Sequence, residues 1–430
     1  MIRFLLLVAG TCALLSRISP VYAQDQMSLN LAEAKKLCLE NNPGLSAALL
    51  DVAASLEVPT EYRAAYLPTL QGSVTGVVSD MGSRLAAGGL NNPVVYNRFA
   101  TGLSINQLVT DFGRTSRLID MAKLRADAQQ QTAEQERSDI LLITGQAYFE
   151  LLREQAVLRV AKKTVAARQY LADQVAALAR NSLKTELDVS FANVNLGNAK
   201  LLQVQAENSY RAAQARLAAV LGLPGNTTFT LAEEPLPAPL SPLIDPLIQQ
   251  ALQQRPEIKR LQFEQSAAET FVRAEYALNY PSIGIMGTAG LVPAGQAQVP
   301  DRYGAIGFNI NVPIFNGGLF KARENEARLR AGAAAKHLRD AEIQISLAVR
   351  TACLEEKTAF DRLELSEQIL KQAQTAFGFA LSRYNLGLSS IVELSQAQLN
   401  LTSAQIDTAS AKYEYQSKSL GVDYQTGALN

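Results

Sequence analysis

The sequence predicts a mainly α-helical protein with a small β part, in which long α-helical hairpins alternate with short strands. Three observations lead to this class. Two long stretches lack proline and are rich in helix-forming residues, four short segments have the composition of strands, and the same order of elements occurs twice along the chain. Together they indicate an elongated protein that arose by internal duplication.

Composition limits the functions open to this chain. Its 430 residues carry 40 basic and 40 acidic side chains, so the formal net charge is zero and no nucleic-acid partner is expected. One His and three Cys are too few for a zinc cluster or a disulfide framework, and we expect no metal and no cofactor. A mean hydropathy of +0.01 argues against a bundle of membrane-spanning helices. We therefore expect a structural or binding role and no enzyme.

The first 23 residues have the pattern of a signal peptide. Arg3 provides a short basic start, residues 4–15 are apolar, and Val21-Tyr22-Ala23 is a small-residue cleavage site. The apolar run is too short to cross a bilayer as a helix. The pattern predicts an exported protein whose mature chain begins at residue 24.

Proline places the long helices. None occurs between Pro93 and Pro224, and none follows Pro313. Proline is the strongest helix breaker, at about 3 kcal/mol in a helix interior, so both stretches can hold unusually long helices. Residues 113–180 and 318–384 would each extend roughly 100 Å at 1.5 Å per residue. Their Ala-rich patterning is typical of closely packed, coiled-coil-like helix pairs.

Strand signals lie between the helices. They cover residues 67–78, 99–109, 282–291 and 303–314, with polar loops expected near 79–98 and 292–302. In the last strand the apolar side chains share one face, and the small or polar ones share the other. Outer-membrane barrel strands and half-buried soluble sheets both show this alternation. Four strands cannot close a barrel in lipid, so a transmembrane role would require several copies of the chain.

The two halves of the chain repeat each other. Asn42-Pro43 and Arg255-Pro256 lie 213 residues apart, and Leu221-Gly222 and Leu420-Gly421 lie 199 residues apart. Matching elements occur in the same order between these markers. We therefore divide the mature chain into a first repeat at 24–223, a Pro-rich connection at 224–246 and a second repeat at 247–430.

At this point the sequence resembles the TolC-type outer-membrane efflux protein family. Short motifs in order carry the resemblance: Leu31-Ala32-Glu33-Ala34, Asn41-Asn42-Pro43, Thr110-Asp111-Phe112-Gly113-Arg114, Val312-Pro313-Ile314-Phe315-Asn316-Gly317-Gly318, Arg383-Tyr384-Asn385-Leu386-Gly387-Leu388 and Leu420-Gly421. The resemblance implies a homotrimer in the outer membrane of a Gram-negative bacterium. Each chain would give four strands to one transmembrane β-barrel of 12 strands, and its hairpins would form a periplasmic helical barrel.

The resemblance also implies the function and the partners. The trimer would be a passive exit duct, in contact with outer-membrane lipid and with a periplasmic adaptor. An inner-membrane pump of the resistance–nodulation–division or ATP-binding-cassette type would supply energy and selection. Small-molecule or drug efflux is our first expectation for the cargo, and type I secretion of a protein or peptide is the alternative.

Residues at the periplasmic tip are the candidate site, again by resemblance. Turns at 181–186 and 385–391 would form the closed end. The residues that match the family's aperture are Asp188, Tyr384, Glu393 and Gln396, and those that match its adaptor-docking surface are Leu183, Gly387 and Leu388. A ring of carboxylates attracts cations. The sequence departs from the family at Gln396, where a second acid could stand, and at Ser389, where a latching Arg could stand.

Plainer interpretations stay open for these and other residues. Asp188 and Glu393 could be ordinary solvated helix charges, and Gly387 could serve only a positive φ at a helix end. His337 is expected to be a surface or packing residue, and Cys38 and Cys353 to be buried free thiols unless they form a disulfide. Two rival classes are a periplasmic coiled-coil adaptor, which leaves the strand pairs unexplained, and a secreted enzyme, for which no catalytic constellation is present.

Overall fold

The computed structural model describes residues 27–80, 98–225, 227–240, 243–295 and 301–429. The expected signal peptide at 1–23 and most of the expected loop at 79–98 lie outside the described residues. So does the middle of the loop expected at 292–302.

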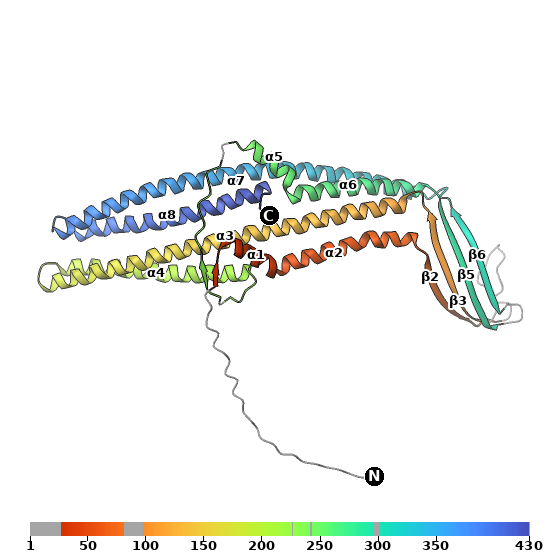
Figure 1. Ribbon diagram of the computed structural model, residues 1–430, viewed down its shortest axis with the longest axis horizontal. Helices are drawn as coiled ribbons and strands as arrows, with labels where there is room; N and C mark the ends of the chain where they lie inside the picture. The colour runs from red at the N-terminus through yellow and green to blue at the C-terminus, as the bar shows by residue number, and fades with distance from the viewer. Residues whose placement is uncertain (1–26, 81–97, 226, 241–242, 296–300, 430) are drawn as a thin grey trace, which may run out of the picture.

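Two long helical hairpins dominate the molecule (Figure 1). Helix α3 (Arg114–Arg180) turns back into α4 (Glu186–Val220), and α7 (Leu319–Asn385) turns back into α8 (Ile391–Thr426). Both α3 and α7 contain 67 residues, so the long helices expected at 113–180 and 318–384 are confirmed to within one residue at each end. The proline-free sequence permits this length, and packing of each long helix against its partner stabilises it.

Shorter helices lie beside the long ones, from the middle of the molecule toward the sheet (Figure 1). Helix α1 (Leu31–Asn41) leads into α2 (Pro43–Arg63), and α5 (Asp245–Gln254) leads into α6 (Pro256–Tyr276). Both α2 and α6 begin with proline, whose missing N–H costs nothing at the first helical position. Pro59 lies inside α2, and the helix continues past it to Arg63.

One antiparallel sheet lies at the end of the molecule remote from the two hairpin turns (Figure 1). Its strand order is β2-β3-β5-β6, made of β2 (Thr69–Val77), β3 (Arg98–Thr110), β5 (Ser282–Gly295) and β6 (Arg302–Asn311). The four expected strands are present, with two changes of boundary.

Strand β5 is longer than expected and β6 is shorter. The sequence predicts a loop from residue 292, but β5 continues to Gly295, and the Val292 N–H donates a 2.7 Å hydrogen bond to the Asp301 carbonyl. The start of the expected loop at 292–302 is therefore wrong. Strand β6 ends at Asn311 and does not reach 314, because Pro313 has no N–H to donate to a ladder.

The strand register brings most of the large apolar side chains of the four strands onto one face. Ile105 lies opposite Leu70 on β2 and Gly287 on β5, and Ile285 lies opposite Phe308 on β6. The exposed large apolar residues of this face include Leu70, Val74, Phe99, Leu103, Ile105, Ile285, Leu291, Ile306, Phe308 and Ile310. Ile306 is 84% exposed and Phe308 is 76% exposed, so no described element covers this face.

The middle of the molecule carries a small packed region beside the long helices. Strands β1 (Met27–Leu29) and β4 (Phe229–Leu231) pair in parallel, and the Tyr148 hydroxyl donates to the carbonyls of Leu29 and Ala232. The two described cysteines are buried in different clusters and are free, which confirms the expectation for Cys38 and Cys353.

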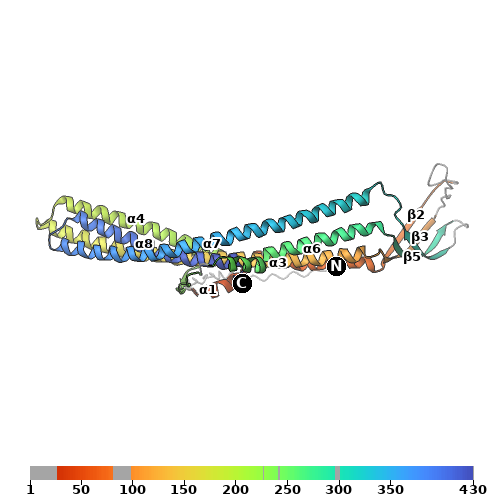
Figure 2. The same cartoon turned by 90° about the horizontal axis from the view of Figure 1, so that it is seen from above.

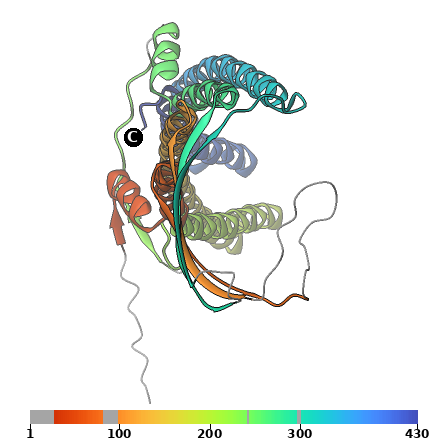
Figure 3. The same ribbon diagram turned by 90° about the vertical axis from the view of Figure 1, so that its right-hand side faces the viewer.

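The described part of the chain is long and curved (Figures 1 and 3). In the end-on view of Figure 3 the sheet and helices form an arc, with α1 and α5 on its convex side. Figures 2 and 3 place the tip ends of α4 and α8 on the concave side of α3. Among the described helices, none is both long enough and apolar enough to cross a membrane.

Candidate functional site

Each hairpin ends in the same kind of tight turn. The Leu183 N–H donates to the Leu178 carbonyl at 3.0 Å, and the Leu388 N–H donates to the Arg383 carbonyl at 2.8 Å. This six-residue closure requires a left-handed residue just before it. Gly387 fills that position in the second turn with φ +74°, and Ser182 fills it in the first with φ +59°. Gly387 is thus required by backbone conformation, whatever else it contacts.

Side-chain caps then start the returning helices. The Asp188 N–H donates to the Thr185 hydroxyl at 3.2 Å, while the Thr185 N–H donates back to the Asp188 carboxylate at 3.0 Å. Hydrogen bonds from the Thr185 backbone and hydroxyl, helped by the Lys184 charge, hold the pKa of Asp188 below its usual value. Glu393 has the same place in the second hairpin, where its N–H donates to the Ser390 hydroxyl. Asp188 is therefore the ionised partner of the N-cap residue Thr185 in the capping box of α4.

Tyr384 joins the two hairpins. Its ring is buried at the end of α7, packed in one cluster with Val175 from α3 and Leu394 from α8. The Lys184 ammonium, from the other hairpin's turn, lies 4.4 Å from the ring centroid, which is cation–π distance. Burial raises the pKa of the Tyr384 phenol, and the Asp188 charge adds to the shift. The structure thus brings Tyr384 and Asp188 together, and Lys184 with them.

The Tyr384 hydroxyl and the Ser389 hydroxyl are both buried, and neither has a hydrogen-bond partner among the described residues. Ser389 stands where the family resemblance suggested a latching Arg. The Arg383 guanidinium pairs with Glu393, and its Nε lies 3.7 Å from Glu393 Oε1. Sequence reasoning passed over Arg383, although it precedes Tyr384 directly.

Gln396 lies one turn further along α8, where it lines a groove between α4 and α8. Its side-chain amide donates to Asn400 at 3.0 Å. Gln396 is exposed, whereas Tyr384 is buried. The four aperture candidates therefore separate into two that meet across the hairpins, Asp188 and Tyr384, and two on α8, of which only Glu393 has an ion-pair partner.

The docking candidates form an exposed apolar end. Leu183 is 69% exposed and Leu388 is 66% exposed, each at the extremity of its turn. Leu183 lies in the turn between α3 and α4, and Leu388 lies in the turn between α7 and α8.

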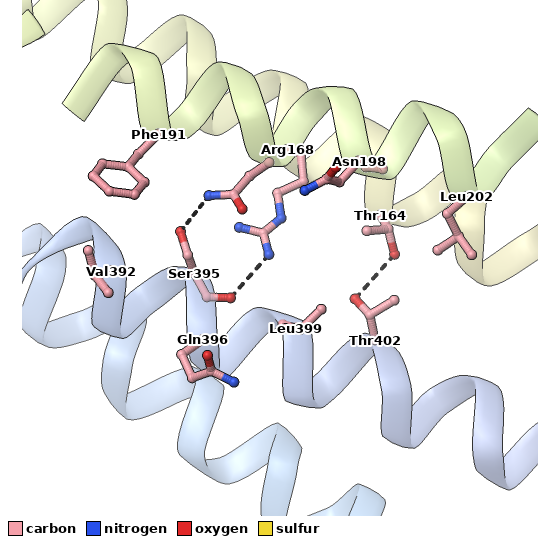
Figure 4. A pocket seen from close by; sticks show the side chains of 12 residues that line it. Thr164, Arg168, Phe191, Asn198, Leu202, Val392, Ser395, Gln396, Leu399 and Thr402 are labelled. Atoms are coloured by element: carbon pink, nitrogen blue, oxygen red, sulfur yellow. Dashed lines mark hydrogen bonds between the residues drawn. The ribbon is translucent and has the colours of Figure 1, made fainter. Parts of the chain in front are cut away.

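A groove of about 400 Å³ lies just above the tip, between α4 and α8 with α3 as its floor (Figure 4). Arg168 of α3 is buried in it, and its Nη2 donates to the Ser395 carbonyl at 3.1 Å. Asn195 donates to the Ser395 hydroxyl at 3.0 Å, and the Thr164 and Thr402 hydroxyls lie 3.4 Å apart. Sequence reasoning missed Arg168, because a lone Arg in a long polar helix gives no local signal.

The described ranges contain no cluster of three His, Cys, Asp or Glu side chains that could hold a metal ion. His337, on α7, is exposed, as expected of a surface residue.

Known proteins resemble this chain over most of its length. Residues 35–223 and 247–428 match the model of a family described as outer membrane efflux protein. The chain is 22% identical over 422 residues to outer membrane protein TolC of Salmonella enteritidis, covering 93% of this chain and 82% of that protein. It is 24% identical over 425 residues to alkaline protease secretion protein AprF of Pseudomonas aeruginosa, covering 95% and 86%.

The fold also matches solved structures. The outer-membrane channel OprN superposes with a TM-score of 0.79 at 21% identity, covering 92% of this chain and 89% of that one. A structure of CusC superposes with a TM-score of 0.77 at 21% identity, covering 92% of both chains. The arrangement of sheet, long hairpins and tip turns is therefore shared with outer-membrane channels.

Proposed function

The chain belongs to the outer membrane efflux protein family and is located in the outer membrane, and we propose that it forms the trimeric exit duct of a tripartite export system. Three copies would join their sheets into one barrel and their hairpins into one periplasmic tunnel. The duct itself would conduct passively, with energy and selection supplied by the pump. Within this duct we assign residues 24–223 and 247–430 to two structural repeats and 224–246 to their connection.

The uncovered sheet is the observation that carries this proposal. One of its faces is apolar, and its outer strands β2 and β6 have no further strand partner within the described chain. Exposed apolar faces and unpaired edges are unfavourable in water, and open edges are excluded from lipid. Three sheets of four strands joined edge to edge give a closed barrel of 12, with the apolar face toward lipid.

The tip supports the assignment of partners. The exposed leucines at 183 and 388, with Gly387 between the hydrogen-bonded ends of its turn, offer a small apolar surface for a periplasmic adaptor. The adaptor would connect the duct to an inner-membrane pump of the resistance–nodulation–division or ATP-binding-cassette type. Asp188, Tyr384, Glu393 and Gln396 would surround the narrow end of the tunnel.

Small-molecule efflux is the preferred cargo, and type I secretion of a protein or peptide is the second candidate. AprF, whose name states a role in secretion of an alkaline protease, matches nearly the whole chain and favours the second candidate. The same duct geometry serves both, because the pump selects the cargo.

The decisive experiment is to cross-link the tagged full-length protein in cell envelopes and to identify what copurifies with it. We expect a trimer in the outer-membrane fraction together with an adaptor and a pump, and the pump's class decides between the two cargoes. A monomer, or recovery outside the outer membrane, would contradict the duct.

Leu388→Asp tests the docking surface separately. We expect export to fail while the trimer forms at normal levels, whereas the conservative Leu388→Met should export normally. If Leu388→Asp exports as well as the unchanged protein, the adaptor does not dock at this turn.

A further inference from the structure

The groove above the tip contains a buried positive charge with no counter-charge. Arg168 is only 5% exposed, and it makes no salt bridge among the described residues. None of the 12 residues that line the groove is Asp or Glu. Burial lowers the pKa of the Arg168 guanidinium, yet an arginine stays protonated in proteins. The groove therefore holds a full positive charge that nothing in it neutralises.

Part of that guanidinium also lacks an acceptor. Nη2 donates to the Ser395 carbonyl at 3.1 Å, whereas Nη1 is buried and has no partner among the described residues. A buried donor without an acceptor is costly, and a charged one more so. In Figure 4 the guanidinium lies between α4 and α8, with Asn198 beside it and Gln396 across the groove on α8. An anionic oxygen entering here would satisfy both the charge and the missing acceptor.

The rest of the lining is mixed in character. Phe191 and Val392 stand at one end, and Leu202 and Leu399 continue the apolar lining at the other (Figure 4). Phe191 and Val392 are also partly accessible to solvent, at 43% and 54% exposure. Such a groove suits a molecule with a compact anionic group and an apolar body, since sites of this kind combine apolar contact with a few fixed polar groups.

The groove opens toward the concave side of the chain. Helix α3 is its floor, and α4 and α8, which form its walls, lie on the concave side of α3 (Figures 2 and 3). In the proposed trimer the concave side faces the tunnel, so this step rests on the proposed function. Each protomer would then present one such groove to molecules in transit.

We propose that the Arg168 groove is a binding site for amphiphilic organic anions, those carrying a sulfonate or carboxylate on an apolar body, inside the duct. The anionic group pairs with Arg168 Nη1, and the apolar body lies against Phe191 and Val392. The site gives the tunnel a cargo preference of its own, in addition to the selection made by the pump.

Calorimetric titration of the full-length protein in lipid nanodiscs tests this site with two matched probes. Naphthalene-2-sulfonate carries the anionic group, and 2-naphthalenemethanol carries the same rings without the charge. We expect the sulfonate to bind at one site per protomer, and Arg168→Gln to weaken it about tenfold or more, as the loss of a charged hydrogen bond does. The alcohol should bind with its affinity changed less than twofold.

Two further variants keep the test decisive. Arg180→Gln removes an exposed guanidinium from the same helix and should leave sulfonate binding unchanged. Gln396→Glu adds a negative charge to the groove without altering Arg168, and should weaken the sulfonate and spare the alcohol. This variant keeps the proposal testable if Arg168→Gln does not fold.

The outcomes separate this proposal from the proposed function. The groove is not an anion site if the sulfonate and the alcohol bind equally well. It is also not an anion site if Arg168→Gln and Gln396→Glu both keep full sulfonate affinity. Either result would leave the proposed duct intact if the protein still conducts ions in bilayers. If the sulfonate binds as expected but the protein forms neither a trimer nor a conducting channel, the duct is wrong and the binding site stands.

Discussion

The Lys184 ammonium lies 4.4 Å from the centre of the Tyr384 ring, so the turn between α3 and α4 contacts the last turn of α7. Lys184 belongs to the first hairpin and Tyr384 to the second. The contact therefore couples the two tips within one chain. The contact is made by the ammonium and the face of the ring. The Tyr384 hydroxyl takes no part in it and has no hydrogen-bond partner among the described residues.

This contact predicts different effects for ring and hydroxyl. Tyr384→Phe should change the stability of the tip by less than about 1 kcal/mol, because no hydrogen bond is lost. Tyr384→Ala should cost about 3 kcal/mol or more through the cavity that it leaves. Amide hydrogen exchange in the turn at 386–390 measures both, and equal exchange rates for Phe and Ala would show that the ring does not pack as described.

Removing the cation should have a smaller effect. Lys184→Met keeps the side-chain length and loses roughly 0.5–1 kcal/mol of cation–π attraction. We expect exchange in the same turn to accelerate a few-fold. Lys200→Met, on the solvent-exposed side of α4, is the control and should leave the turn unchanged.

Two substitutions of Gly387 distinguish a role in the backbone conformation of the turn from a role in adaptor docking. No atom lies within 4 Å of the position of a Cβ there, so Gly387→Ala meets only the cost of φ +74°, about 1–2 kcal/mol. Gly387→Asn should cost less, because asparagine tolerates this conformation. Thermal unfolding gives the ranking Gly, Asn, Ala. Export that follows the same ranking indicates a backbone role, whereas equal loss of export in both variants indicates docking.

Ion selectivity should depend on Glu393 and Arg383 together. In the proposed trimer three copies of Glu393 converge, and Glu393→Gln should reduce the cation preference of the closed pore. Arg383 lies 3.7 Å from Glu393 and partly neutralises it, so Arg383→Gln should increase that preference. Reversal potentials in planar bilayers measure both shifts. If neither variant moves the reversal potential, Glu393 does not line the conducting path.

Glu356, on α7, predicts a dependence of stability on pH. Its carboxyl is buried, and burial raises its pKa above 4.5, while hydrogen bonds from Tyr415 and the Leu240 backbone only partly oppose the shift. Below pH 4.5 the folded and unfolded chains are both protonated, and the group has no effect. Above it the unfolded chain ionises first, so stability is lost as the pH rises toward the folded pKa.

Glu356→Gln should therefore remove this loss. We expect the variant to gain thermal stability relative to the unchanged protein between pH 5 and pH 8, with the difference vanishing near pH 4. Glu364→Gln, exposed on the same helix, is the control. A difference that does not vary with pH would mean that Glu356 is ionised in the fold.

Much of the helical architecture could be predicted from the chain. The absence of proline set where α3 and α7 could run, and the Asn42-Pro43 marker of the first repeat coincides with the start of α2, which the Asn42 side chain caps. The end of β5 was missed because residues 292–295 carry Pro293 and glycine, which read as a loop. Pairing with the neighbouring strands keeps them extended.

The candidate site was predicted only where local sequence carries it. The turn at 385–391 needs a residue in the left-handed conformation, and the glycine at position 387 indicated this from the sequence. Lys184 and Arg168 gave no such signal. Lys184 meets Tyr384 and Arg168 meets Ser395, and the members of each pair are 200 or more residues apart in sequence.

The sequence by itself determined the elements of this protein: two proline-free hairpins, four alternating strands and their duplicated order, because helix breaking and side-chain alternation are local properties. The tertiary structure decided which charges are paired and which are not. Asp188 accepts a hydrogen bond from the Thr185 N–H, and Glu393 pairs with Arg383. Arg168 is buried beneath α4 and α8, and its Nη1 has no hydrogen-bond partner among the described residues. These outcomes depend on which helices pack together, because packing determines both desolvation and charge pairing.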